Sequence, residues 1–170
     1  MTYSLLDSLQ EPGNLSIAFQ PVFGLDGGPN PIYALRASVR GPGGTHFEDS
    51  TVLLQYVQRK QAESFLDRAC LKLVCEAATR LPKDIRIHVP AHTATLAQDA
   101  GYVWDFFRTV ETSGLEAACF TIDVIDSDRE KRHDPLVSLN ELRQLGVHIG
   151  LSGVGFANAS WRLLLDRRSP

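Results

Sequence analysis

Residues 31–42 read PIYALRASVRGP, and the interpretation of the whole chain starts from this stretch. Because successive side chains of a strand point to opposite faces of a sheet, the stretch predicts a strand with one largely apolar face and one polar face. The first face holds Tyr33, Leu35, Ala37 and Val39, and the second holds Ala34, Arg36, Ser38 and Arg40. Two arginines and a serine on one face are unlike a protein core, so this face is expected to line either solvent or a ligand.

Length and composition narrow the class of protein. The chain has 170 residues, of which 44% are hydrophobic, which favours one domain with a substantial core. The formal net charge of -3 argues against a nucleic-acid surface. No apolar run approaches the roughly 18 residues of a membrane span, and no signal peptide is evident, so a cytoplasmic protein is expected. Cys70, Cys75 and Cys119 lack the spacing of a zinc site and are expected to be buried thiols.

Turn signals and hydrophobic periodicity divide the chain into alternating elements. Residues 1–14 are expected to be a loose lead-in and residues 15–170 a single domain. The predicted strands are 15–23, 31–40, 84–89, 119–125 and 147–152, of which the first two form a hairpin. The predicted helices are a short one capped by Ser50 or Thr51, one over 62–80, a helical region within 93–113, one from Asp134 to 146 and one after Asn158.

The alternation of strands and helices predicts an α/β fold with a mostly parallel sheet. Several strands share an apolar face that should meet helices and a face that bears polar side chains. These polar positions are Arg36, Ser38, Arg40, Arg86, His88, Asp123, His148 and Ser152. A doubly wound sheet needs two apolar faces, whereas a barrel turns polar residues inward near its mouth. About five strands are predicted, so the expected fold is an incomplete (β/α) barrel of the TIM type.

The order of several short motifs resembles the EAL domain of cyclic-di-GMP phosphodiesterases. FQPV at 19–22 is similar to the opening Tyr-Gln-Pro-Ile strand, and RASVR at 36–40 stands where the Glu-Ala-Leu-x-Arg signature belongs. LDR at 66–68, IHVP at 87–90 and IDVID at 122–126 resemble the Leu-Asp helix start and two further strands. LGVHIGLSGVG at 145–155 resembles the family's Leu-Gly strand and its Asp-Asp-Phe-Gly loop. Every motif departs from the family pattern, so the resemblance is to a degenerate EAL domain.

The resemblance implies where the family's metal ligands should lie. The signature glutamate corresponds to Arg36, the strand asparagine to His88, and the strand glutamate to Asp123, while the paired aspartates correspond to Ser152 and Gly153. Only Asp123 keeps a carboxylate, whereas magnesium-type cations need several carboxylate oxygens. The expected outcome is that Mg²⁺ or Mn²⁺ binding is lost, that Arg36 pairs with Asp123, and that no phosphodiesterase activity remains.

Other positions leave ligand binding open. Gln20 and Arg40 match family positions that contact the nucleotide, and together with Ser38 and Asp123 they are candidates for cyclic-di-GMP binding. The chain stops after about five strands where the family continues, so the expectation is a C-terminally shortened domain with open sheet edges. An open sheet, association of two copies and a fragment of a longer protein all remain possible. The main hypothesis is a catalytically inactive signalling module that binds a protein partner or a second copy; the alternatives are a non-hydrolysing cyclic-di-GMP receptor and a phosphodiesterase with altered metals.

Overall fold

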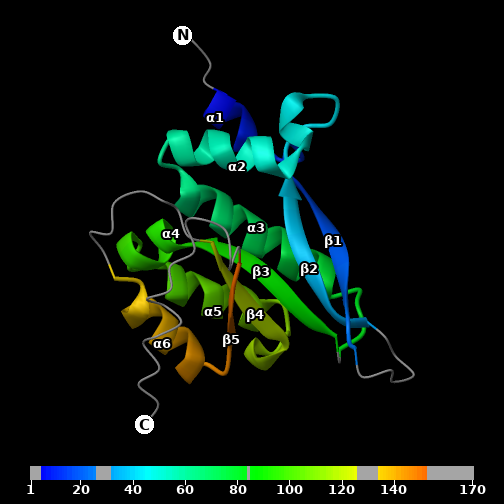
Figure 1. Cartoon of the computed structure of the whole chain (residues 1–170), viewed down its shortest axis with the longest axis vertical. Coiled ribbons are helices and arrows are strands. Elements are labelled where there is room, and N and C mark those ends of the chain that lie inside the picture. The colour runs from blue at the N-terminus through cyan, green and yellow to red at the C-terminus, as the bar shows by residue number, and fades with distance from the viewer. Residues whose placement is uncertain (1–4, 26–31, 84, 126–133, 153–170) are drawn as a thin grey trace.

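The computed structural model describes residues 5–25, 32–83, 85–125 and 134–152. In this part of the chain five strands form one sheet in the order β1-β2-β3-β4-β5 (Figure 1). The strands are β1 Ser16–Phe23, β2 Ile32–Arg40, β3 Arg86–His92, β4 Phe120–Ile125 and β5 His148–Leu151. β1 runs antiparallel to β2, and every later neighbouring pair is parallel. The predicted α/β class, the first hairpin and the open, incomplete barrel-like sheet are confirmed.

Helices connect the parallel strands and cover the apolar face of the sheet. The helices are α1 Leu5–Leu9, α2 Ser50–Arg59, α3 Glu63–Ala78, α4 Thr93–Gln98, α5 Tyr102–Thr112 and α6 Leu136–Gln144. α3 packs against the first three strands and α6 against β5. Phe106 of α5 meets Phe120 of β4 edge to face, with ring centroids 5.7 Å apart. Burial of such apolar surface is the main stabilising term, which explains why one face of each strand is apolar.

Strand register confirms the predicted faces. Leu35 pairs with Ile87, and Val89 pairs with Ile122, so apolar side chains line up from strand to strand on the helix side. Tyr33 is an exception, because 52% of its surface is exposed and the guanidinium of Arg86 lies 5.4 Å from its ring centroid. Near the start of β2, the guanidinium of Arg86 is therefore within cation–π distance of an exposed aromatic ring.

Three predicted boundaries differ from the structure. The lead-in is not loose over residues 5–9, because α1 buries Leu9 in the core and Asn14 donates a hydrogen bond to the Ser8 carbonyl at 2.8 Å. The helical region within 93–113 is two helices, since Asp99 and Gly101 lie in the turn between α4 and α5. β3 begins at Arg86 and continues through Pro90 to His92, three residues past the predicted end.

The cap of α2 is one residue earlier than predicted. Asp49 is the N-cap, and its carboxylate accepts hydrogen bonds from the backbone of Thr51 and Val52. Ser50 instead donates to the Val39 carbonyl at 2.7 Å. The N-cap of α6 is Pro135 and not Asp134 as predicted, although the Asp134 carboxylate still accepts a hydrogen bond of 3.0 Å from the Leu136 backbone. The predicted loop 153–156 and the helix after Asn158 lie outside the described residues.

Candidate functional site

Three side chains meet on the polar face of the sheet: Arg36 of β2, Asp123 of β4 and Ser152, which directly follows β5. The guanidinium of Arg36 in β2 lies 3.1 Å from Oδ2 of Asp123 in β4. The same guanidinium donates a hydrogen bond of 2.6 Å to the Ser152 hydroxyl. Arg36 is half exposed, with 45% of its side chain accessible, whereas Asp123 is buried. The predicted Arg36–Asp123 pair is therefore present, and Ser152 completes a bridge across the sheet.

Strand register and one glycine make this meeting possible. Arg36 pairs with His88, and Asp123 lies beside Pro90 on one side and Gly150 on the other. A Cβ atom on Gly150 would lie 2.5 Å from Oδ1 of Asp123, well inside van der Waals contact. Gly150 thus provides the space that the carboxylate occupies.

His88 approaches the same carboxylate from β3. Its Nδ1 lies 3.3 Å from Oδ1 of Asp123. Its Nε2 is buried and makes no hydrogen bond to any described residue. Asp123 thus faces a guanidinium on one oxygen and an imidazole on the other.

The donor set does not fit a pair of divalent cations. Asp123 contributes the carboxylate of this cluster, and both of its oxygens already face nitrogen atoms of Arg36 and His88. Within the described ranges no three His, Cys, Asp or Glu side chains are grouped so that they could hold a metal ion. Gly153, the other predicted position, lies outside these ranges.

The candidate ligand residues Gln20, Ser38 and Arg40 share the polar face but differ in their surroundings. Gln20 is exposed and pairs with Arg36 in the β1–β2 register. Arg40 is exposed at the end of β2, and no ion pair to another described residue involves it. Ser38 is half-buried and shares a 2.7 Å hydrogen bond with Ser50. Gln20 and Arg40 are therefore accessible to a ligand, while the hydroxyl of Ser38 is engaged in holding α2 to β2.

Comparison with known families decides the assignment. The profile of the EAL domain matches residues 4–168. The chain belongs to the EAL domain family. The family has a TIM-barrel-like fold, consistent with the alternating elements and the mixed sheet described above.

Solved structures with the same fold include several EAL proteins. The PaMucR phosphodiesterase in its c-di-GMP complex has a TM-score of 0.72 and 20% identity over 89% of this EAL chain and 64% of its own. The cAMP-bound EAL enzyme Bd1971 has a TM-score of 0.76 and 12% identity over 94% and 46%. The EAL domain of Mycobacterium smegmatis DcpA has a TM-score of 0.65 and 18% identity over 89% and 60%.

Three further observations accompany this comparison. The present EAL chain spans less than two thirds of the length of each of these three solved chains. Curated proteins contain no sequence that matches it. Among the described residues, no helix has both the length and the apolar character that crossing a membrane requires.

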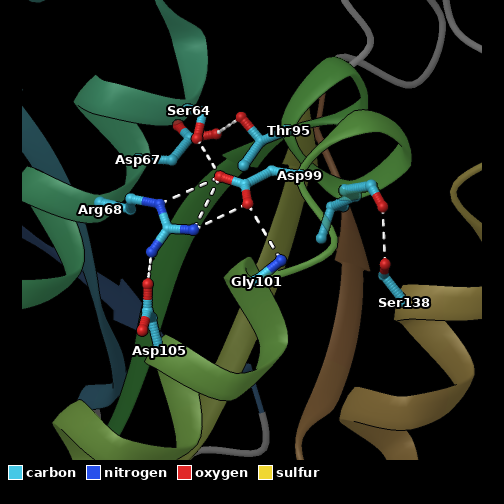
Figure 2. A network of polar contacts seen from close by, with 9 residues as sticks. Ser64, Asp67, Arg68, Thr95, Asp99, Gly101, Asp105 and Ser138 are labelled. Atoms are coloured by element: carbon cyan, nitrogen blue, oxygen red, sulfur yellow. Dashed lines mark hydrogen bonds and ion pairs between the residues drawn. The ribbon is translucent and has the colours of Figure 1, made fainter.

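A second polar group, which sequence reasoning missed, lies between α3 and α4. Asp67 of α3 is buried and accepts hydrogen bonds from His92 and Thr95. The next residue of α3, Arg68, binds the Asp99 carboxylate through two nitrogens and also pairs with Asp105 of α5 (Figure 2). The sequence signal was the adjacent charged pair Asp67-Arg68 within α3, and its role depends on partners about 25 to 37 residues away.

The cysteines of this EAL chain take no part in either polar group. Cys70 and Cys75 are buried as predicted, and Cys119 is only half-buried, with its sulfur 3.6 Å from the Lys83 carbonyl. Burial raises the pKa of both buried thiols, that of Cys75 to about 12. A thiol with so high a pKa is protonated near neutral pH and a poor nucleophile.

Proposed function

We propose that this chain is a non-hydrolysing EAL module that regulates cyclic-di-GMP-type signalling in the cytoplasm through contacts with other proteins. The observation that carries the proposal is the position of the Arg36 guanidinium. It stands where the family resemblance implies a metal-binding glutamate, and it bridges Asp123 and Ser152.

Electrostatics makes this arrangement hostile to a divalent ion. Two unit charges 4 Å apart interact by about 4 kcal/mol at an effective dielectric near 20, and a divalent cation doubles this repulsion. Asp123 offers a single negative charge that the guanidinium already neutralises. Without bound metal, water is not activated near neutral pH by the route that metal-dependent phosphodiesterases use.

Hydrolysis assays test the inactive state. The intact chain is incubated with cyclic-di-GMP and either Mg²⁺ or Mn²⁺, beside an active EAL phosphodiesterase as positive control. We expect no linear dinucleotide from this chain. Metal-dependent product that Arg36→Ala or Asp123→Asn alters would overturn the proposal, because it would place turnover in this cluster.

A second candidate function is a cyclic-di-GMP receptor without turnover. It is favoured by the exposure of Gln20 and Arg40 on the same sheet face as Arg36. An arginine can bind a phosphate through two parallel hydrogen bonds, and such a contact between Arg40 and the nucleotide needs no metal.

Isothermal calorimetry with cyclic-di-GMP separates the two candidates. If the receptor hypothesis holds, the wild-type chain binds and Arg40→Ala weakens binding by about tenfold or more, the loss of one charge-assisted pair. Arg59→Ala, at an exposed position in α2, is the matched control and should leave the affinity unchanged. If the wild-type chain gives no heat with cyclic-di-GMP, the receptor hypothesis is rejected and the protein-contact function is the one that remains.

A further inference from the structure

The buried carboxylate of Asp67 lies outside the Arg36–Asp123 cluster on which the proposed function rests. Its Oδ2 accepts hydrogen bonds from the His92 backbone at 2.8 Å and from the Thr95 hydroxyl at 2.5 Å. Its Oδ1 lies 2.8 Å from Nδ1 of His92. One side chain of α3 thus holds the end of β3 and the first turn of α4.

His92 is arranged so that it can take up a proton without losing a hydrogen bond. A carboxylate only accepts hydrogen bonds, so in the contact with Asp67 the hydrogen is on Nδ1 of His92. Nε2 is fully buried and has no hydrogen-bond partner in the part of the chain that the structure describes. A second proton therefore enters at Nε2 and creates a charged pair with Asp67.

The charges around His92 are mainly negative. From α3, both Asp67 and the buried Glu63 face it, and Thr95 of α4 and the buried Tyr102 of α5 are uncharged near neutral pH. The nearby cation on α3, Arg68, is already bound by Asp99 and Asp105. Burial lowers the pKa of His92, but Asp67 and Glu63 outweigh it and the net pKa is raised above its usual 6.5.

We propose that Asp67, His92 and Thr95 form a proton-dependent latch that holds α3 to the β3–α4 junction more tightly when His92 is protonated. β3 also carries His88 of the polar face, so the latch controls how firmly one wall of the candidate site is held. The latch rests on the fold and not on whether cyclic-di-GMP binds.

The direction of the pH effect follows from the raised pKa. Protonation of the folded state adds stability that is complete below the pKa of an unfolded histidine, about 6.5. That added stability is lost as the pH rises through the higher pKa of folded His92. The latch is therefore strongest in mildly acidic solution and weakens toward alkaline pH.

The first experiment is an NMR titration of the imidazole groups in the wild-type chain, with His92 assigned through its proximity to Thr95. We expect its inflection to lie above about 6.5, the usual value for an exposed histidine. An inflection at or below about 6.5 overturns the latch. This measurement needs no variant and stands even if substitutions at His92 prevent folding.

The second experiment measures Tm from pH 5.5 to 8.5 for the wild type, His92→Gln and the control His46→Gln. Glutamine donates to Asp67 but does not titrate. The wild type and His46→Gln should lose about 2–4 °C more than His92→Gln over this range, the size of a modest stability change in a chain of this length. Identical pH profiles for all three proteins would contradict the proposal.

Discussion

At residue 150 the absence of a side chain determines how Asp123 is used. The Asp123 carboxylate occupies the space that a Cβ at this position would need, and from there Oδ2 reaches Arg36. In the sequence, Gly150 belongs to the predicted strand 147–152 and to the stretch LGVHIGLSGVG that resembles a family motif. In the folded chain it is a steric condition for the charge bridge.

We predict that Gly150→Ala destabilises the protein by about 1–3 kcal/mol, the usual cost of forcing an extra methyl group into packed surroundings. The new methyl group pushes the Asp123 carboxylate away from Arg36. Urea unfolding measures the change. Gly43→Ala is the control, because a Cβ there would meet no atom within 4 Å, and its effect should stay within about 0.5 kcal/mol. Equal effects of the two substitutions would show that residue 150 imposes no such steric condition.

At the scale of elements, Arg68 joins α3 to the turn after α4 and to α5. Its guanidinium donates from Nε and Nη2 to Asp99 and pairs with Asp105 (Figure 2). Ser64, one turn earlier on α3, also donates to Asp99. These contacts explain why the predicted single helical region divides at Asp99, since the turn is held by side chains of another helix.

Arg68→Met keeps the length of the side chain but removes the charge and the donors. We expect a loss of about 2 kcal/mol in the free energy of unfolding, as for hydrogen bonds to charged groups. Arg59→Met in α2 is the matched exposed control, with an expected change within about 0.5 kcal/mol. Chemical denaturation of both variants decides whether Arg68 stabilises the helix layer.

The same contacts predict an acid dependence. Burial raises the pKa of Asp99, but hydrogen bonds from Ser64 and Arg68 lower it more, so the folded pKa lies below the usual value. The resulting stability is present above the unfolded pKa near 3.9 and disappears as the pH falls through the folded one. Arg68→Met should therefore lose less stability than the wild type between pH 5 and pH 3. A larger loss in the variant would contradict this sign.

At the scale of the whole molecule, the described sheet has β1 at one edge and β5 at the other. Exposed backbone groups of an edge strand can pair with another chain. Large apolar side chains are exposed around the last residue of β1 and the first residues of β2, namely Phe23, Leu25, Ile32 and Tyr33. These features support the proposed contacts with a partner or a second copy.

We predict that the wild-type chain self-associates in a concentration-dependent manner in light scattering after size exclusion. Phe23→Lys places a charge at the exposed end of β1 and should shift the chain toward monomer by about tenfold in dissociation constant. Val137→Lys changes an exposed residue of α6, and this control should leave association unchanged. A wild-type chain that stays monomeric at all concentrations would contradict self-association and leave a different partner to be sought.

Much of the architecture was predictable because strand and helix periodicities are local. The alternation in residues 31–42 correctly separated Ala37 and Val39 from Arg36, and the hairpin, the parallel strands and the long helix α3 followed from similar patterns. Short-range turns and caps were less reliable. Serine is a common N-cap residue, but the Ser50 hydroxyl donates its hydrogen bond to the Val39 carbonyl. Asp49 is therefore the N-cap of α2.

The sequence by itself determined the two-faced strands and the order of elements. Only the tertiary structure decided that Arg36 bridges Asp123 and Ser152, that Ser38 is taken up by Ser50, and that Asp67 reaches His92. The physical reason is the sequence separation over which each feature is set. The face of a strand on which a side chain lies depends on the backbone geometry of a few neighbouring residues. Contacts such as Arg36 to Ser152, 116 residues apart, exist only once strand order and register bring the two ends together.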